Sequence, residues 1–295
     1  MKTIIKTIKR SSKVAGLVLL LAIPVNLFAQ ETVESLLDRA TASGIDQTRI
    51  TEVRQRVQER GMSDQEFMSI IQPAIDMADE NLPYEMIFEK VLEGLSKGVS
   101  TQRMAPVLSS IHENASRSAQ FVDRWMQRSE VRKFVERGEG RMEREQFRNE
   151  MVKAGSKAMM QNIDEGILIE TLNNVSEGNM DKVKPSGLLA AINILGDLPN
   201  GSNSASQNAR LVLRALQSGF EAGDIQKLPA ALNMAQRRSQ LPAAAVGKGF
   251  MEQIERGFPS ERILQNMFNG QVGGGPPGNV PGGIMNERPG RPGGN

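Results

Sequence analysis

Apolar residues in this chain recur three or four positions apart, in short segments that glycine and proline separate. Between residues 31 and 98 this spacing places them on one face of each of four short helices. The four stripes are Val33, Leu36, Leu37 and Ala40; Ile50, Val53 and Val57; Phe67, Ile70, Ile71 and Ala74; and Tyr84, Ile87, Phe88, Val91, Leu92 and Leu95. No segment alternates apolar and polar residues for the length of a strand. We therefore expect an all-α fold of helical hairpin repeats, arranged as an irregular α-solenoid or bundle.

Glycine marks the expected helix ends. Gly98 follows Lys97, a cation that suits the last turn of a helix, and Ser100 can cap the next helix. A left-handed glycine at this position would end the helix, and Val99 would pack back on the last turn. The same signal occurs at Gly44, Gly61 and Gly257, and in weaker form at Gly178 and Gly223.

The segment 82–104 returns without a gap as 241–263, and 5 of its 23 positions are identical. Each copy opens with Leu-Pro, which starts the second helix of a pair because proline fits a first turn and disfavours helix in the residue before it. Three pairs are expected: 61–98 with Leu82 and Pro83, 178–223 with Leu198 and Pro199, and 223–257 with Leu241 and Pro242. Glycine and proline also punctuate helical proteins without repeats, but the gapless match is longer than punctuation requires.

The first copy contains the run Glu-Gly-Leu-Ser-Lys-Gly-Val at residues 93–99. With its Leu-Pro start, this run resembles an element of uncharacterised exported bacterial proteins with helical-hairpin repeats. The second copy departs from the element, with Gln253 in place of Gly94 and Phe258 in place of Val99. The resemblance covers the two copies and implies no activity.

Residues 105–177 carry more charge and longer helical patterns than the rest of the chain. A helix break and candidate hinge, Arg-Gly-Glu-Gly-Arg at 137–141, separates two apolar stripes. Mixed charges over 136–150 favour a solvated helix face over a charged binding surface. The two stripes are Ile111, Ala115, Val122, Trp125 and Met126, and then Met142, Phe147, Met151, Ala154 and Ala158.

Both ends of the chain differ in composition from the helical part. Five cations precede an apolar run over 14–28, and Ala29 supplies the small residue of a cleavage site. The run of 15 residues is shorter than the ~20 that a membrane span needs, so we expect a cleaved signal peptide and no stable membrane span afterwards. At the other end, 270–295 holds ten glycines and five prolines among 26 residues, which favours a disordered tail.

The expected organisation follows from these changes of composition. It comprises a signal peptide (1–29), an N-terminal helical region with the first repeat copy (30–104), a charged region of longer helices (105–177), C-terminal helical repeats (178–269) and the disordered tail (270–295).

Loss of the signal peptide changes the charge of the chain. It leaves 31 basic and 34 acidic residues, so the formal net charge moves from +2 to −3. This gives no support for a nucleic-acid partner. The chain has no cysteine, which excludes disulfides, thiolate metal sites and a lipid-anchored cysteine, and stability must come from packing.

The sequence offers few candidates for catalysis. His112 is the only histidine, and a lone histidine without a cysteine favours a structural role. Glu143 with Glu145, and Asp164 with Glu165, are candidate carboxylate pairs for acid–base chemistry on a glycan. Residues one or two positions apart point in different directions on a helix, however, which favours solvation.

Methionine is the remaining candidate ligand. Thioethers bind copper, but the positions of six methionines favour pliable fillers of a core. These are Met62, Met77, Met86, Met104, Met251 and Met267. We therefore assign no catalytic, cofactor-binding or metal-binding residue and expect no cofactor.

Together, these patterns indicate a periplasmic or secreted bacterial protein that acts as a protein-interaction or structural module of the cell envelope, with an unknown protein or envelope partner. The alternative is a cell-envelope hydrolase or lyase that acts on glycan or peptide through carboxylates. A third class is a periplasmic metal or ligand carrier. A binding module should show an extended groove, whereas an enzyme needs a concave site with convergent carboxylates.

Overall fold

The computed structural model describes residues 32–136, 143–178, 180–199 and 204–273. These residues form thirteen α-helices, a short 3-10 helix and no strand, which confirms the all-α prediction. In chain order they are α1 (Val33–Ala42), α2 (Gln47–Glu59), α3 (Asp64–Asp79), α4 (Glu85–Ser96), α5 (Thr101–Met126), α6 (Ser129–Glu136), α7 (Arg144–Met160), α8 (Glu165–Gly178), α9 (Pro185–Ile194), η1 (Leu195–Asp197), α10 (Ala205–Gln217), α11 (Ala222–Ser239), α12 (Ala243–Glu255) and α13 (Ser260–Asn269).

Some expectations lie outside the described residues. These are the signal peptide over 1–29, the candidate hinge over 137–141, and the tail from residue 274 onward. Within the described ranges, no helix is both long enough and apolar enough to cross a membrane.

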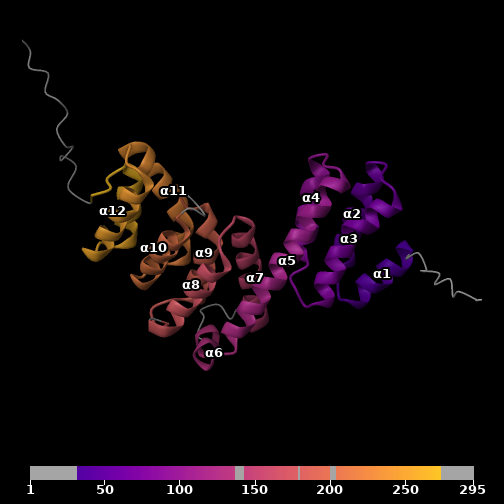
Figure 1. Ribbon diagram of the computed structural model, residues 1–295, viewed down its shortest axis with the longest axis horizontal. Helices are drawn as coiled ribbons and strands as arrows, with labels where there is room; N and C mark the ends of the chain where they lie inside the picture. Colours follow the sequence, from indigo (N-terminus) through magenta and orange to yellow (C-terminus); the bar gives the residue numbers. More distant parts are fainter. Residues whose placement is uncertain (1–31, 137–142, 179, 200–203, 274–295) are drawn as a thin grey trace, which may run out of the picture. The chain divides into compact units, whose positions relative to one another are not determined.

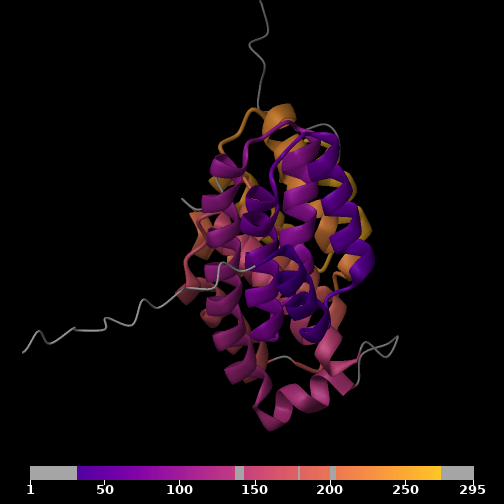
Figure 2. The same cartoon turned by 90° about the vertical axis from the view of Figure 1, so that its right-hand side faces the viewer.

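The helices pack in two rows of neighbours (Figure 1). In the odd row, α1, α3, α5, α7, α9, α11 and α13 contact one another in turn. In the even row, α2 contacts α4, and α8, α10 and α12 contact one another in turn. Between the two parts of the even row, α6 packs on α5 and α7, and α8 packs on α5. Figure 2 shows the first helices, in indigo and magenta, lying side by side. Each helix thus packs mainly on neighbours in the chain or in its row, as in repeat proteins.

Side-chain caps explain where the N-terminal helices begin. Asp46 accepts a hydrogen bond from the Thr48 N–H at 2.8 Å. Ser63 and Glu66 form a reciprocal capping box at the start of α3. Because backbone N–H groups of Thr48 and Ser63 stabilise the charged carboxylates, the pKa values of Asp46 and Glu66 lie below their ordinary values.

The four strong glycine stops are confirmed. Gly44, Gly61, Gly98 and Gly257 have φ values of +79°, +65°, +73° and +73°. These are left-handed conformations that glycine adopts without strain. The chain therefore ends each of these helices where the sequence predicted.

The prediction of a stop at Gly223 is wrong. Gly223 lies in the first turn of α11, and the left-handed glycine before that helix is Gly219, with φ +88°. Phe220 follows it, is buried, and donates its N–H to the Ala215 carbonyl at 3.1 Å. A glycine followed by a large apolar residue is the stronger stop signal, because that residue packs back on the helix. Gly178, the other weak signal, is the last residue of α8.

The two copies of the repeat share a backbone conformation at the Leu-Pro turn. Asn81 has φ +54°, and its equivalent in the second copy, Gln240, has φ +58°. A third turn of this kind lies between α7 and α8, at Asn162 with φ +63°, where no proline marks it. Asparagine tolerates this conformation better than most residues.

Trp125 ties α5 to its neighbours. Its side chain is 3% exposed, and its Nε1 donates to the Leu172 carbonyl at 3.1 Å and to the Ser176 hydroxyl at 2.7 Å, both on α8. The ring also lies near Phe134 of α6 and Phe147 of α7, with centroids 6.3 Å and 6.5 Å apart. The stripes predicted over 105–177 are buried wherever they are described; Met142 lies outside the described residues.

The start of the expected tail is part of the folded structure. Val272 is 8% exposed, and its methyl group and carbonyl lie where a side chain on Gly249 would have to go. Gln253 and Arg256 donate hydrogen bonds to the backbone of residues 271–273. The boundary at Gly270 was therefore wrong by at least four residues, because Gln253 and Gly249 on α12 provide a binding surface that tail composition cannot reveal.

Candidate functional site

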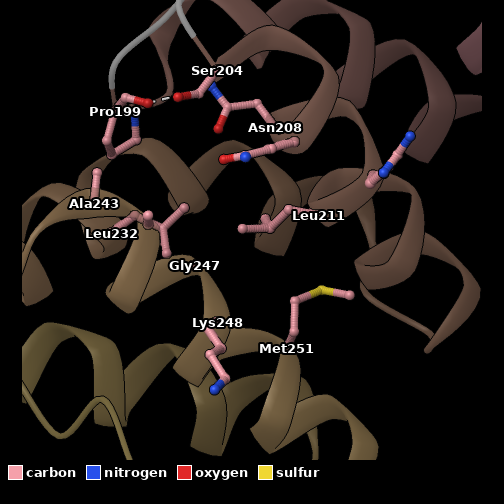
Figure 3. A pocket seen from close by; sticks show the side chains of 12 residues that line it. Pro199, Ser204, Asn208, Leu211, Leu232, Ala243, Gly247, Lys248 and Met251 are labelled. Atoms are coloured by element: carbon pink, nitrogen blue, oxygen red, sulfur yellow. Dashed lines mark hydrogen bonds between the residues drawn. The ribbon is translucent and has the colours of Figure 1, made fainter.

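A groove of about 310 Å³ lies between α10 and α12, beside Pro199 and Ser204 (Figure 3). Leu211 and Leu232 form its buried apolar floor, being 6% and 3% exposed. The other lining residues are Pro199, Ser204, Gln207, Asn208, Arg210, Ala243, Ala244, Gly247, Lys248 and Met251.

Short side chains on α12 open this groove. Gly247 faces α10, since a Cβ atom on it would lie 3.5 Å from Leu211 Cδ1. Ala243 lies one turn earlier in α12, near Pro199. On the other wall, Asn208 is 8% exposed and donates from Nδ2 to the Pro199 carbonyl at 3.3 Å. The walls are thus fixed by helix packing and a hydrogen bond, while the space between them holds no described side chain.

The charge of the groove is positive. Arg210 and Lys248 line it, and none of the described residues that line it carries a carboxylate. Arg210 is exposed and has no ion pair among the described residues. The Lys248 side chain is 79% exposed, and its Nζ lies 3.9 Å from Glu252 Oε1. Since exposed pairs at this distance contribute little, both cations can attract an anionic group.

The equivalent place in the first repeat copy is filled. Tyr84 aligns with Ala243, and Phe88 aligns with Gly247. The Phe88 side chain is 1% exposed, and its ring meets that of Tyr84 edge to face, with centroids 6.0 Å apart. The helices concerned are α2 and α4, which contact each other as α10 and α12 do. The second copy thus has a similar pair of contacting helices but lacks the two aromatic rings of the first copy.

His112 takes a structural position. Its Nε2 lies 3.0 Å from Glu80 Oε1 and links α5 to the end of α3. The candidate carboxylates are not brought together either. Asp164 accepts the N–H of Gly166 at 2.8 Å, while Glu165 accepts hydrogen bonds from Arg117.

Glu145 lines a shallow hollow of about 500 Å³ with Asp123. Arg148 donates from Nε and Nη2 to the two carboxylate oxygens of Asp123, at 2.6 Å and 2.8 Å. This pairing raises the pKa of Arg148. Arg148 also donates to the Asn81 carbonyl at 2.8 Å, so one side chain of the charged segment 136–150 connects α7 to the first Leu-Pro turn. Glu143 lies outside this hollow and precedes the first turn of α7.

The six methionines lie in or against the core, as predicted. Met77, Met104 and Met267 are buried, and Met62, Met86 and Met251 are partly buried against the core. Met251 also lines the groove. Among the described residues, no three His, Asp or Glu side chains gather where they could hold a metal ion.

No family model matches the chain, and neither a curated protein nor a solved structure matches it. The groove itself was not predicted from the sequence. The signal was nevertheless present in the alignment of the two copies. The large residues Tyr84 and Phe88 of the first copy align with the small residues Ala243 and Gly247 of the second.

Proposed function

We propose that this chain is an exported α-helical repeat protein that acts as a protein-interaction module of the bacterial cell envelope. Export rests on the cations, apolar run and Ala29 of residues 1–29. Interaction rests on the groove between α10 and α12, with its apolar floor and cationic edge. A short segment of a partner protein, apolar on one side and carrying carboxylates beside it, fits this chemistry.

The single observation that carries this proposal is the unfilled space over Leu211 and Leu232. Helical repeat proteins commonly bind partners on surfaces formed by adjacent repeats. Apolar pockets with a few charged groups at the edge are the usual form of a binding site. The groove combines both features, and its lining contains no carboxylate that could act as an acid or base.

Photo-crosslinking in cells tests the proposal. A photoreactive amino acid at Ala244, an exposed residue of the groove, should give a protein adduct that the same group at Gln102, exposed on α5, does not give. Gly247→Phe in the Ala244 crosslinking protein should remove the adduct by filling the groove. Gly223→Phe, which adds the same ring in open space on α11, should leave it. An adduct that survives Gly247→Phe, or no adduct from Ala244, would contradict the proposal.

A further inference from the structure

We infer that the groove between α10 and α12 binds a helical segment of another protein through two aromatic side chains four residues apart. The inference rests on the proposed function and names the chemistry of its partner. Its basis is that the first repeat copy fills the equivalent place with Tyr84 and Phe88, at i and i+4 of the chain.

The first copy shows what this space accepts. Tyr84 and Phe88 meet edge to face at an interplanar angle of 80°, an arrangement that aromatic pairs prefer. Tyr84 directs its hydroxyl to the Gly44 carbonyl in the turn before α2, at 3.4 Å. Both rings are thus supplied by the α4 end of the first copy, and the phenol of Tyr84 reaches the turn before α2.

The second copy preserves the frame for the same two rings. Gln240 and Gly257 take the left-handed conformations of Asn81 and Gly98. With the alignment of the two copies, α12 ends at the position where α4 ends and begins one residue earlier. The space over Leu211 is open, and Pro199 lies in the chain before α10 as Gly44 does before α2.

The adjacent leucine is also uncovered in the second copy. Leu82 is 5% exposed, whereas the aligned Leu241 is 39% exposed and is one of three exposed large apolar side chains among the described residues. Leu241 lies two positions before Ala243, which lines the groove. An exposed apolar side chain therefore precedes the groove-lining residue Ala243 by two positions in the chain.

The chain cannot supply the two rings itself. Among the described residues, the aromatic side chains that are not buried are Tyr84, Phe258 and Phe268, and no two of them are four residues apart. Residues 137–142, 200–203 and 274–295 contain no Phe, Tyr or Trp, and residues 1–31 contain only Phe28. A second copy of this chain is excluded as the donor on the same ground. The rings must therefore belong to a different protein.

The charge of the groove adds a second requirement. Phe88 is followed by Glu89 in the first copy, whereas Gly247 is followed by Lys248 in the second. Together with Arg210, this lysine places two cations beside the apolar floor. A partner helix with carboxylates next to its aromatic pair would match them.

A labelled peptide tests the inference on the full mature chain. The probe is a 14-residue, end-capped, alanine-rich helix with Tyr and Phe four residues apart and two glutamates beside them. Fluorescence anisotropy should show saturable binding. Replacement of Tyr and Phe by Ala in the peptide should weaken binding by at least about tenfold. Replacement of its glutamates by Gln should weaken binding less, and only at low salt.

A variant of the protein tests the same idea by changing the groove. Ala243→Tyr combined with Gly247→Phe restores the residues of the first copy, so it should abolish probe binding and raise the melting temperature. Gly223→Phe should change neither by a comparable amount. Equal binding of the all-alanine peptide, or probe binding that survives in the folded double variant, would overturn the inference. The peptide comparison uses unaltered protein, so it decides the matter even if the double variant fails to fold.

The result can be separated from a failure of the proposed function. If crosslinking from Ala244 captures a partner through the groove but the crosslinked segment of that partner contains no aromatic pair, the inference alone is wrong. If crosslinking gives no groove-dependent adduct and the aromatic probe does not bind, both are wrong.

Discussion

The side-chain amide of Gln253 donates hydrogen bonds to the carbonyl of Val272 at 3.0 Å and to that of Gln271 at 3.2 Å. Gln253 is fully buried, and its Oε1 accepts a hydrogen bond from Asn266 Nδ2 at 2.8 Å. The side-chain amide of Gln253 on α12 is thus hydrogen-bonded both to α13 and to the residues that follow α13. In the first repeat copy this position is Gly94, which has no group to do the same.

Shortening the chain at two points should separate the folded end from the rest of the tail. A chain that ends at Gly270 removes the two carbonyls to which Gln253 Nε2 donates and exposes the surface under Val272, at a cost of about 1 to 3 kcal/mol. For a chain of this size that lowers the melting temperature by several degrees. A chain that ends at Gly273 keeps both contacts and should melt as the full chain does. Equal melting of the two truncated chains would contradict the assignment.

The left-handed glycines predict a stability effect of known sign. Gly98→Ala and Gly257→Ala should each destabilise the fold by about 1 to 2 kcal/mol, because a Cβ atom strains this backbone. Gly223→Ala is the matched control, since that residue has ordinary helical backbone with open space around it. It should stabilise α11 by up to about 1 kcal/mol. Urea unfolding measures all three, and a uniform sign across the set would refute the cap assignment.

Glu93 predicts a pH dependence. Hydrogen bonds from Lys90 and Lys97 lower its pKa from 4.5 to about 2. A folded-state pKa below the unfolded value means that the ion pairs stabilise the fold above about pH 4.5 and lose this effect as the pH falls toward 2. Glu93→Gln should therefore lower the melting temperature at pH 7 and do so progressively less below pH 4.5. Because the side chains are well exposed, the effect should also shrink in high salt.

The control for Glu93 lies on the same helix. Glu89 is exposed and has no ion pair among the described residues, so Glu89→Gln should have little effect at any pH. A Glu93 effect that stays constant from pH 7 to pH 3 would show that the lysines are not its cause.

The contact between α5 and α7 predicts a coupled pair. A side chain on Gly155 would overlap the Ser118 hydroxyl and lie 3.0 Å from Phe121 Cζ. Gly155→Ala should cost about 1 to 3 kcal/mol through overpacking. The Ser118 hydroxyl is buried without a hydrogen-bond partner among the described residues, so Ser118→Ala should be neutral or stabilising.

The double variant distinguishes this from two independent effects. With Ser118→Ala present, Gly155→Ala should cost less by at least about 0.5 kcal/mol, because the overlapping oxygen is gone. Additive effects in a double-mutant cycle would show that the contact with the Ser118 hydroxyl does not set the cost of Gly155→Ala.

The proposed export predicts a processed N-terminus. Mass spectrometry of the protein from the cell envelope should find a chain that begins at Gln30, because the apolar run over 14–28 is short and Ala29 follows it. Ala29→Arg should block this cleavage and leave a longer form. An intact Met1 in the envelope fraction of the unaltered protein would contradict the prediction.

The sequence predicts well those features of the fold that depend on neighbouring residues, namely helix ends and buried helix faces. Gly44, Gly61, Gly98 and Gly257 end helices because few other residues tolerate positive φ. Apolar stripes three or four residues apart become buried faces because the helix brings them together. The turn at Asn162 was missed because it has neither glycine nor proline.

Features that depend on distant residues could not be predicted in this way. The groove exists because Gly247 faces Leu211 of another helix, and nothing near either residue in the sequence indicates that they meet. Burial of Val272 likewise depends on Gly249 and Gln253. A comparison of the two repeat copies, position by position, is the one sequence signal that points to the groove.

The packing of helices mainly on near neighbours has a consequence for how the molecule opens. Local unfolding of the helices at one end need not disturb those at the other end. The terminal helices can therefore unfold while α5 and α7 stay folded and packed on each other. The hydrogen bond from Gln253 to the Val272 carbonyl affects how readily the C-terminal helices unfold. The two walls of the groove, α10 and α12, lie close to that end, so their amide protons should exchange with solvent sooner than those of α5. A ligand that joins these walls would slow their exchange, and hydrogen-exchange mass spectrometry could therefore detect an occupant before its identity is known.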